Sequence, residues 1–88
     1  MATFRFKISS PDGNLFDGTA EMVSVRGAEG DLAVMAGHIP FVTTVQPCDC
    51  TVDTEDGERR VGHTEGGLLS VTEQEATLFS WNFRWNEA

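Results

Sequence analysis

The sequence predicts an all-β protein, a sandwich or flattened barrel of antiparallel strands. Apolar and polar residues alternate with a period of two through most of the 88 residues, a pattern typical of half-buried strands. Turn signals recur about every eight to twelve residues, and no stretch of helical periodicity lies between them. A chain of this length forms one modest core, so we expect a single domain over residues 1–88.

The first half of the chain contains several expected strand segments. In TFRFKIS, the residues Phe4, Phe6 and Ile8 share one face. The PDG sequence at residues 11–13 predicts a turn, because proline presets φ and glycine tolerates a positive φ. LFDG and the alternating EMVSVR follow, and the loop GAEG separates them from LAVMA.

The second half begins with a corner, GHIP, followed by FVTTVQ, whose β-branched residues suit a pleated sheet. CDCTVD and RRVGHT flank TEDGE, where Asp56-Gly57 is a strong hairpin signal. GGLLSVT and ATLFSW flank EQE, which predicts a second hairpin. The tail, residues 81–88, is expected to be an extra strand or arm with Trp81, Phe83 and Trp85 on one face. These rings either cover the core of their own subunit or form a contact patch.

Charge restricts the possible partners. Six lysines and arginines oppose fourteen acidic residues, giving a formal net charge of −8. Such a surface repels phosphate groups, so we expect no nucleic-acid partner and no direct membrane insertion. The chain has no apolar run of the roughly 18 residues that a membrane span needs, and no signal-peptide pattern. Its two cysteines form no secretory framework, which favours a soluble cytosolic protein with reduced thiols.

Candidate metal ligands are few. The histidines are His38 and His63, which Cys48, Cys50 or Glu65 could assist. No second Cys-x-Cys or Cys-x-x-Cys completes a set of four ligands, so we expect neither a metal nor a cofactor. The two cysteines are expected to pack as small hydrophobic residues, since residues two apart on a strand are poorly placed for a disulfide.

No set of residues indicates catalysis. There is no Gly-x-Ser-x-Gly elbow, no glycine-rich loop leading into a helix, and the paired carboxylates lie in turns. We therefore predict that the chain is not an enzyme by itself. Two alternatives remain open. One is a small metal-dependent β-barrel enzyme using His38, His63 and Glu65, and the other is a self-associating binding module using the aromatic tail.

The corner around His38 has its own interpretation. Gly37 permits an unusual backbone angle, and Pro40 keeps Ile39 extended. The imidazole between them can donate, accept and stack. We expect His38 either to fix this corner or to contact a partner.

Several motifs occur in a distinctive order: SPDGNLFDG, VSVRGAEGDLAVMAGHIPFVTTVQP, EGGLLSV and ATLF. In this order and spacing they resemble the N-terminal β-sandwich domain of the epsilon subunit of F-type ATP synthases, called delta in mitochondria. The similarity runs from about Phe4 to Phe79. Its most specific positions are Gly27, Glu29, Gly30, Asp31, Gly37, His38, Pro40, Thr43 and Pro47.

The resemblance implies a sandwich of about ten strands that is not catalytic. It implies a place in the central stalk of the rotor, peripheral to the cytoplasmic face of the cell membrane, between the gamma subunit and the c-ring. There the subunit helps couple ion flow to ATP synthesis. On this sequence, Glu29, Gly30 and Asp31 are implied to face the c-ring. Ser10, His38 and Thr43 are implied to lie at or near the gamma contact.

The sequence departs from the family pattern in two places. After Pro47 the family usually has glycine and an apolar strand, where this chain has CDCTVD. The family also typically continues into a C-terminal helical hairpin that can restrain ATP hydrolysis, whereas this chain stops at Ala88. We expect a naturally short member without the hairpin, with a piece of a longer chain as the alternative. Such a subunit would couple but would not inhibit through the hairpin.

Overall fold

A computed structural model describes residues 2–86, and this part of the chain is folded entirely from strands. The all-β fold predicted from the alternation is confirmed. No helix in this part of the chain could cross a bilayer. The nine strands are β1 (Phe4–Ser10), β2 (Gly13–Gly27), β3 (Gly30–Met35), β4 (Phe41–Val45), β5 (Cys48–Thr54), β6 (Arg59–Thr64), β7 (Gly67–Val71), β8 (Glu75–Ser80) and β9 (Phe83–Trp85).

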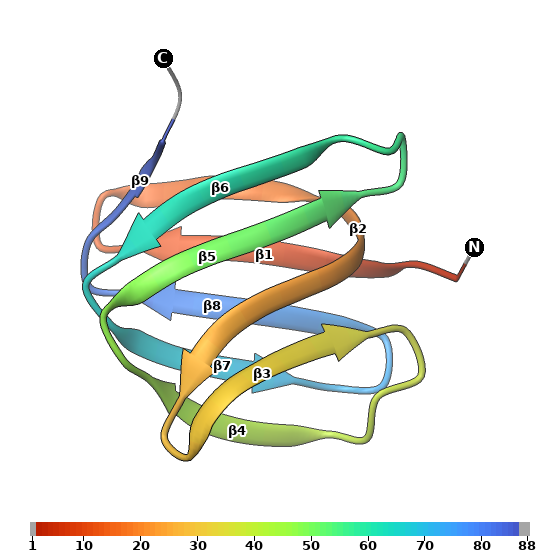
Figure 1. Ribbon diagram of the computed structural model, residues 1–88, viewed down its shortest axis with the longest axis horizontal. Coiled ribbons are helices and arrows are strands. Elements are labelled where there is room, and N and C mark those ends of the chain that lie inside the picture. Colours follow the sequence, from red (N-terminus) through yellow and green to blue (C-terminus); the bar gives the residue numbers. More distant parts are fainter. Residues whose placement is uncertain (1, 87–88) are drawn as a thin grey trace.

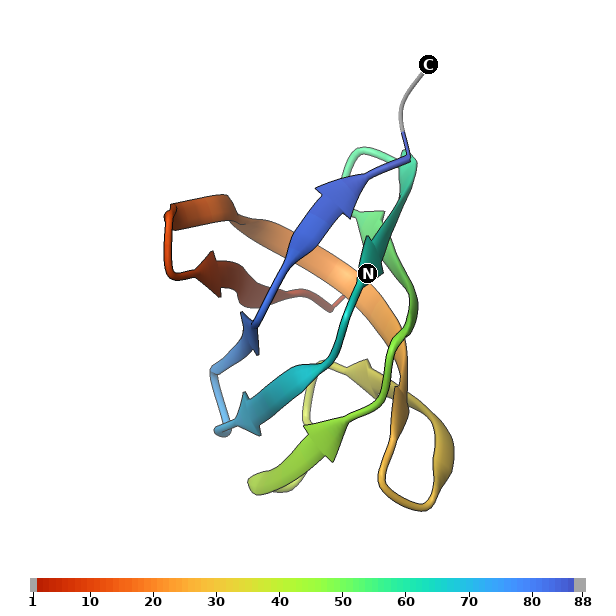
Figure 2. The same cartoon turned by 90° about the vertical axis from the view of Figure 1, so that its left-hand side faces the viewer.

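The strands form two layers that share β2. Their order is β1-β8-β7-β4-β2-β5-β6-β9, with β3 attached to β2 and a further pairing between β1 and β2. In the view of Figure 1, β1, β8 and β7 lie behind, and β6, β5 and β3 lie in front. Figure 2 shows β2 curving from one layer to the other. The predicted sandwich therefore has one strand that belongs to both of its sheets.

The bend of β2 has a local cause. LFDG and EMVSVR are parts of one strand of 15 residues. Its pairing with β5 is interrupted between Ala20 and Met22, where the register shifts by one residue. An extra residue of this kind bends a strand and increases its twist, so β2 can pass between the layers without a loop.

Two details differ from the expectation. The structure has nine strands in the described residues, against the approximately ten that the resemblance implied. All pairings are antiparallel except that of β1 with β8, which is parallel, with Phe6 opposite Ala76 and Ile8 opposite Leu78. This parallel pair joins strands from the two ends of the chain, so no local turn signal indicates it.

The core lies between the layers. Phe6, Ile8, Leu69 and Leu78 are 0% exposed, and burial of each such side chain contributes about 1.5–3 kcal/mol. Phe4 is 8% exposed, so the expected inward face of β1 is confirmed. The other buried apolar residues are Ala20, Val23, Val25, Val34, Val45, Cys50, Val52, Val71, Ala76 and Phe83.

The described part of the aromatic tail packs onto its own chain. β9 pairs with β6, and Phe83 is 7% exposed. Trp85 packs edge-on against Phe83, with ring centroids 5.0 Å apart, and the Arg60 guanidinium lies 3.9 Å from the Trp85 ring centroid. Trp81 is 67% exposed, so the three rings do not share one face. Residues 87–88 of the predicted arm lie outside the described residues.

Candidate functional site

The implied c-ring residues form the tip of the β2–β3 hairpin, which we call the acidic turn (Glu29–Asp31). Gly27 and Gly30 lie opposite each other, and Gly30 has a φ of 121°, which favours glycine. Glu29 and Asp31 are both exposed. Arg26 Nε lies 3.1 Å from the Asp31 carboxylate, and both side chains are solvated, so this ion pair adds little stability. The turn therefore presents its carboxylates to solvent.

Two of the implied gamma residues, Ser10 and His38, maintain local turns. Ser10 Oγ donates to Gly13 O at 3.1 Å and accepts from the Asp12 N–H at 3.2 Å. The His38 N–H donates to Met35 O at 3.2 Å, and the imidazole lies 5.1 Å from the Phe41 ring. His38 thus makes the contacts expected of a residue that fixes a corner.

Thr43, the third implied gamma residue, contacts the residue that precedes the acidic turn. Its Oγ1 accepts from the Ala28 N–H at 3.5 Å and donates to Thr44 O at 3.1 Å. A hollow of about 330 Å³ separates this part of β4 from the acidic turn. Residues 28–32 and 41–43 line the hollow. Thr43 is therefore a neighbour of the implied c-ring residues.

The structure does not bring Ser10, His38 and Thr43 together. Ser10 ends β1, at the turn on the left of Figure 1, whereas His38 lies in the β3–β4 loop on the right. The surface that extends between these two ends is the outer face of the layer formed by β4, β7 and β8. A single contact with Ser10 and His38 would have to cover much of this face, and Thr43 lies in β4 with its side chain on the opposite side of the strand.

This outer face carries no charged residue at its six central positions, and we call it the uncharged face. Val42 lies opposite Ser70, which lies opposite Thr77. Thr44 lies opposite Leu68, which lies opposite Phe79. Val42 is 63% exposed and Phe79 is 45% exposed. On a chain with a net charge of −8, an uncharged stretch of sheet with exposed apolar side chains is typical of a protein interface.

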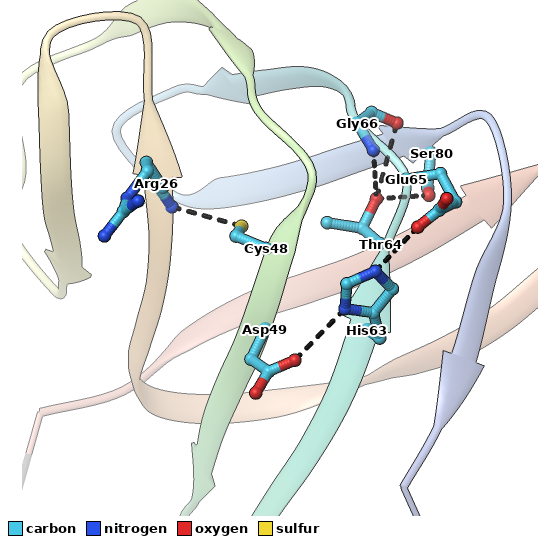
Figure 3. A network of polar contacts seen from close by, with 8 residues as sticks. All are labelled: Arg26, Cys48, Asp49, His63, Thr64, Glu65, Gly66 and Ser80. Carbon is cyan, nitrogen blue, oxygen red and sulfur yellow. Dashed lines mark hydrogen bonds and ion pairs between the residues drawn. The ribbon is translucent and has the colours of Figure 1, made fainter.

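The other layer carries a charged cluster around His63, shown in Figure 3. His63 Nδ1 lies 3.1 Å from an Asp49 oxygen, and Nε2 lies 2.6 Å from a Glu65 oxygen. The hydrogen bond with Asp49 and then that with Glu65 raise the pKa of His63. Both ring nitrogens thus have partners within the protein.

The candidate metal ligands are dispersed. Within residues 2–86, no three His, Cys, Asp or Glu side chains are arranged to hold a metal ion. His63 and Glu65 are neighbours, but His38 lies at the opposite end of the sandwich (Figure 1). Cys48 and Cys50 are both free thiols. Cys48 Sγ accepts from the Arg26 N–H at 3.3 Å, and burial raises the pKa of Cys50 to about 12.

Sequence reasoning missed Asp49 as the partner of His63. The signal was present in the strands CDCTVD and RRVGHT, because pairing them outward from the five-residue segment TEDGE places Asp49 opposite His63, as the structure has it. A two-residue loop at Asp56-Gly57 would instead have placed Cys50 opposite His63. The uncharged face was also missed. Its residues come from three strands that only the long-range register brings together.

Fold and surfaces together define a small β-sandwich domain with an exposed acidic turn and an uncharged outer face. A family model described as the β-sandwich domain of the ATP synthase delta/epsilon chain matches residues 3–85. The chain belongs to this family.

Relatives from several bacteria support this membership. The chain is 40% identical over 80 residues to the ATP synthase epsilon chain of Bradyrhizobium sp. strain ORS 278, and 42% identical to that of Afipia carboxidovorans. Each alignment covers 91% of this chain and 58% of the relative. The chain therefore spans little more than half the length of these relatives.

Solved structures show the same fold at low sequence identity. A chain of the Euglena gracilis mitochondrial ATP synthase matches with a TM-score of 0.89 and 20% identity, over 97% of this chain and 54% of that chain. A central stalk and c-ring structure of the Tetrahymena thermophila enzyme contains a match with a TM-score of 0.74 and 11% identity. That match covers 94% of this chain and 66% of the Tetrahymena chain.

Proposed function

We propose that this chain is a non-catalytic subunit of the central stalk of an F-type ATP synthase. It links the gamma subunit to the membrane c-ring and so helps couple ion movement to ATP synthesis. The complex places it at the cytoplasmic face of the cell membrane, as a peripheral component that is soluble when isolated. Family membership supports this proposal, as does the central-stalk setting of the Tetrahymena match.

The observation that carries the proposal is the contrast between two surfaces of one rigid domain. The uncharged face is suited to burial against another protein, because burying it leaves no charged side chain without a partner. The acidic turn is suited to a solvated contact in which complementary charge fixes the register. A domain with both surfaces can join two different neighbours.

We assign the uncharged face to the gamma subunit. Val42 and Phe79 supply the exposed apolar area, and Ser10 and His38 lie near its two ends. Thr43 lies in β4 with its side chain on the other side of the strand, toward the β2–β3 hairpin. The proposed contact extends from the β1–β2 turn to the β3–β4 corner, which accounts for Ser10 and His38 although they do not touch one another. Thr43 joins it only if the gamma subunit also reaches around the edge of β4.

We assign the acidic turn to the c-ring. Glu29 and Asp31 project from the end of a hairpin, and Gly30 gives the turn its shape. A c-ring loop that carries arginine or lysine would complement these carboxylates. Most of the gain would be in docking rate and orientation, since exposed charge pairs contribute little net affinity.

The gamma contact is tested by mixing the chain with the gamma subunit of the same organism and measuring co-elution at micromolar concentrations. Phe79→Glu places a charge in the uncharged face and is expected to weaken binding by at least about tenfold. Thr51→Glu is the matched control, because it adds the same charge to the outer face of the other layer. The absence of a complex between folded partners, or equal binding by both variants, would overturn the assignment.

A further inference from the structure

The outer edge of β3 has no pairing partner among the described residues. β3 pairs with β2 alone, in an uninterrupted register from Gly27 opposite Gly30 to Met22 opposite Met35. Figure 1 shows β3 as the outermost strand of the front layer. An unpaired edge presents a row of backbone donors and acceptors to solvent.

The hydrogen bonds of Arg26 show which groups form this row. Its N–H donates to Cys48 Sγ at 3.3 Å, and its C=O accepts from the Gln46 N–H at 2.9 Å. Both groups therefore point away from β3, so Arg26 and the opposite Asp31 form a non-hydrogen-bonded pair.

The alternation of an antiparallel ladder extends this result along β3. Leu32 and Val34 direct their backbone groups toward β2, whereas Asp31, Ala33 and Met35 direct theirs outward. Met35 O accepts from the His38 N–H at 3.2 Å. The outward groups left over are the N–H and C=O of Asp31 and Ala33 and the N–H of Met35. These outward groups recur at every second residue, which is the spacing at which an added antiparallel strand would bond.

This edge lacks most of the features that usually prevent strand addition. Natural edge strands are protected by charged side chains, especially lysine, and by proline or a bulge. β3, with the sequence GDLAVM, has Asp31 near its start but no lysine, proline or bulge. Exposed apolar side chains flank it, with Met35 at 55% exposure, Ile39 at 75% and Val42 at 63%. Val42 also belongs to the uncharged face, so the edge and this face form one continuous apolar region.

We propose that β3 accepts an extended segment of the gamma subunit as an additional strand, so that backbone hydrogen bonds supplement side-chain contacts at the uncharged face. This inference rests on the proposed function, which supplies the gamma subunit as the partner. The net charge of −8 opposes pairing with a second copy of this chain and favours a neutral or basic segment. Continuity with the uncharged face identifies the segment as part of the same neighbour.

Amide hydrogen exchange with and without the gamma subunit tests the proposal. In the free chain, the amides of Leu32 and Val34 should be protected, and those of Asp31, Ala33 and Met35 should exchange fast. In the complex, the latter three should slow by at least about tenfold. If the two proteins co-elute and these amides exchange as fast as before, the added strand is disproved while the proposed function stands. If they do not co-elute, the proposed function fails first.

A pair of variants gives an independent readout. Ala33→Pro removes an outward N–H without removing a bond to β2, and Ala33→Ser retains that N–H. We expect Ala33→Pro to weaken gamma binding by about tenfold or more and Ala33→Ser to bind as the unchanged chain does. Equal binding by both variants would overturn the proposal. A free chain that dimerises, and that Ala33→Pro makes monomeric, would instead identify a second copy as the occupant.

Discussion

The ring of Phe83 lies directly over the backbone of Gly62. A β-carbon at position 62 would lie 2.3 Å from Cζ of Phe83 and 2.9 Å from the backbone oxygen of Arg84. Glycine is therefore required for β9 to close onto β6. This contact, together with the packing of Trp85 on Arg60, holds the end of the described chain against the sandwich.

We expect Gly62→Ala to lower the free energy of unfolding by about 1–3 kcal/mol, because the added methyl group displaces the Phe83 ring. Urea denaturation measures the change. The same substitution should cost less in a Phe83→Ala background, where the ring is absent. If the losses of unfolding free energy in the two single variants add up to the loss in the double variant, the two positions do not interact.

Phe6 and Phe79 distinguish the core from the uncharged face. Phe6 is 0% exposed, so Phe6→Ala should destabilise the fold by about 3–5 kcal/mol. Phe79 is 45% exposed, so Phe79→Ala should cost less than about 1 kcal/mol while reducing gamma binding. Urea midpoints of both variants provide the measurement. A large loss of stability in Phe79→Ala would place that ring in the core and remove the case for an interface.

The contribution of His63 to stability should depend on pH. Hydrogen bonds with Asp49 and Glu65 raise its pKa in the folded state, and Arg84 faces it from β9. A raised folded pKa stabilises the fold fully below the unfolded pKa of about 6.5, and this contribution is lost as the pH rises through the folded pKa. His63→Gln should therefore destabilise the chain more at about pH 5.5 than at about pH 9.

Urea unfolding of both proteins at the two pH values measures this difference. Repeating the pair of measurements in an Asp49→Asn background serves as the control, because one of the two carboxylate partners is then neutral. The pH dependence should shrink in that background. If His63→Gln costs the same at both pH values, the two hydrogen bonds do not stabilise the imidazolium.

Asp31→Lys should weaken docking to the c-ring more than it weakens the fold. The substitution reverses one of the two charges of the acidic turn, and it removes an exposed ion pair with Arg26 that contributes at most about 1 kcal/mol. Glu73→Lys, which makes the same charge change in the exposed β7–β8 turn, is the control. Binding to isolated c-ring provides the measurement. Equal effects of the two variants would remove the acidic turn from the contact.

Local patterns predicted most of the fold. Alternation in TFRFKIS gave the buried face of β1, and Asp56-Gly57 gave the β5–β6 hairpin. The parallel pairing of β1 with β8 and the continuity of β2 across both layers depend on contacts between distant parts of the chain. Such contacts leave no periodic signal in either segment.

The surfaces were less predictable than the fold. The acidic turn is a contiguous segment, so its exposure follows from the hairpin that contains it. The uncharged face combines side chains from three strands, and its lack of charge becomes visible only when their register is known. The partner of His63 lies 14 residues away, and it follows from the hairpin only when the loop between the strands is given the length that the structure has.

The passage of β2 through both layers has a mechanical consequence. Its single backbone runs from the β1–β2 turn to the acidic turn and bonds to β1, β3, β4 and β5 along the way. A force that pulls on the tip of the hairpin along this strand loads those ladders in shear, so many bonds must break at once before the strand yields. Torque received at one neighbour would thus reach the other through a stiff element rather than a hinge.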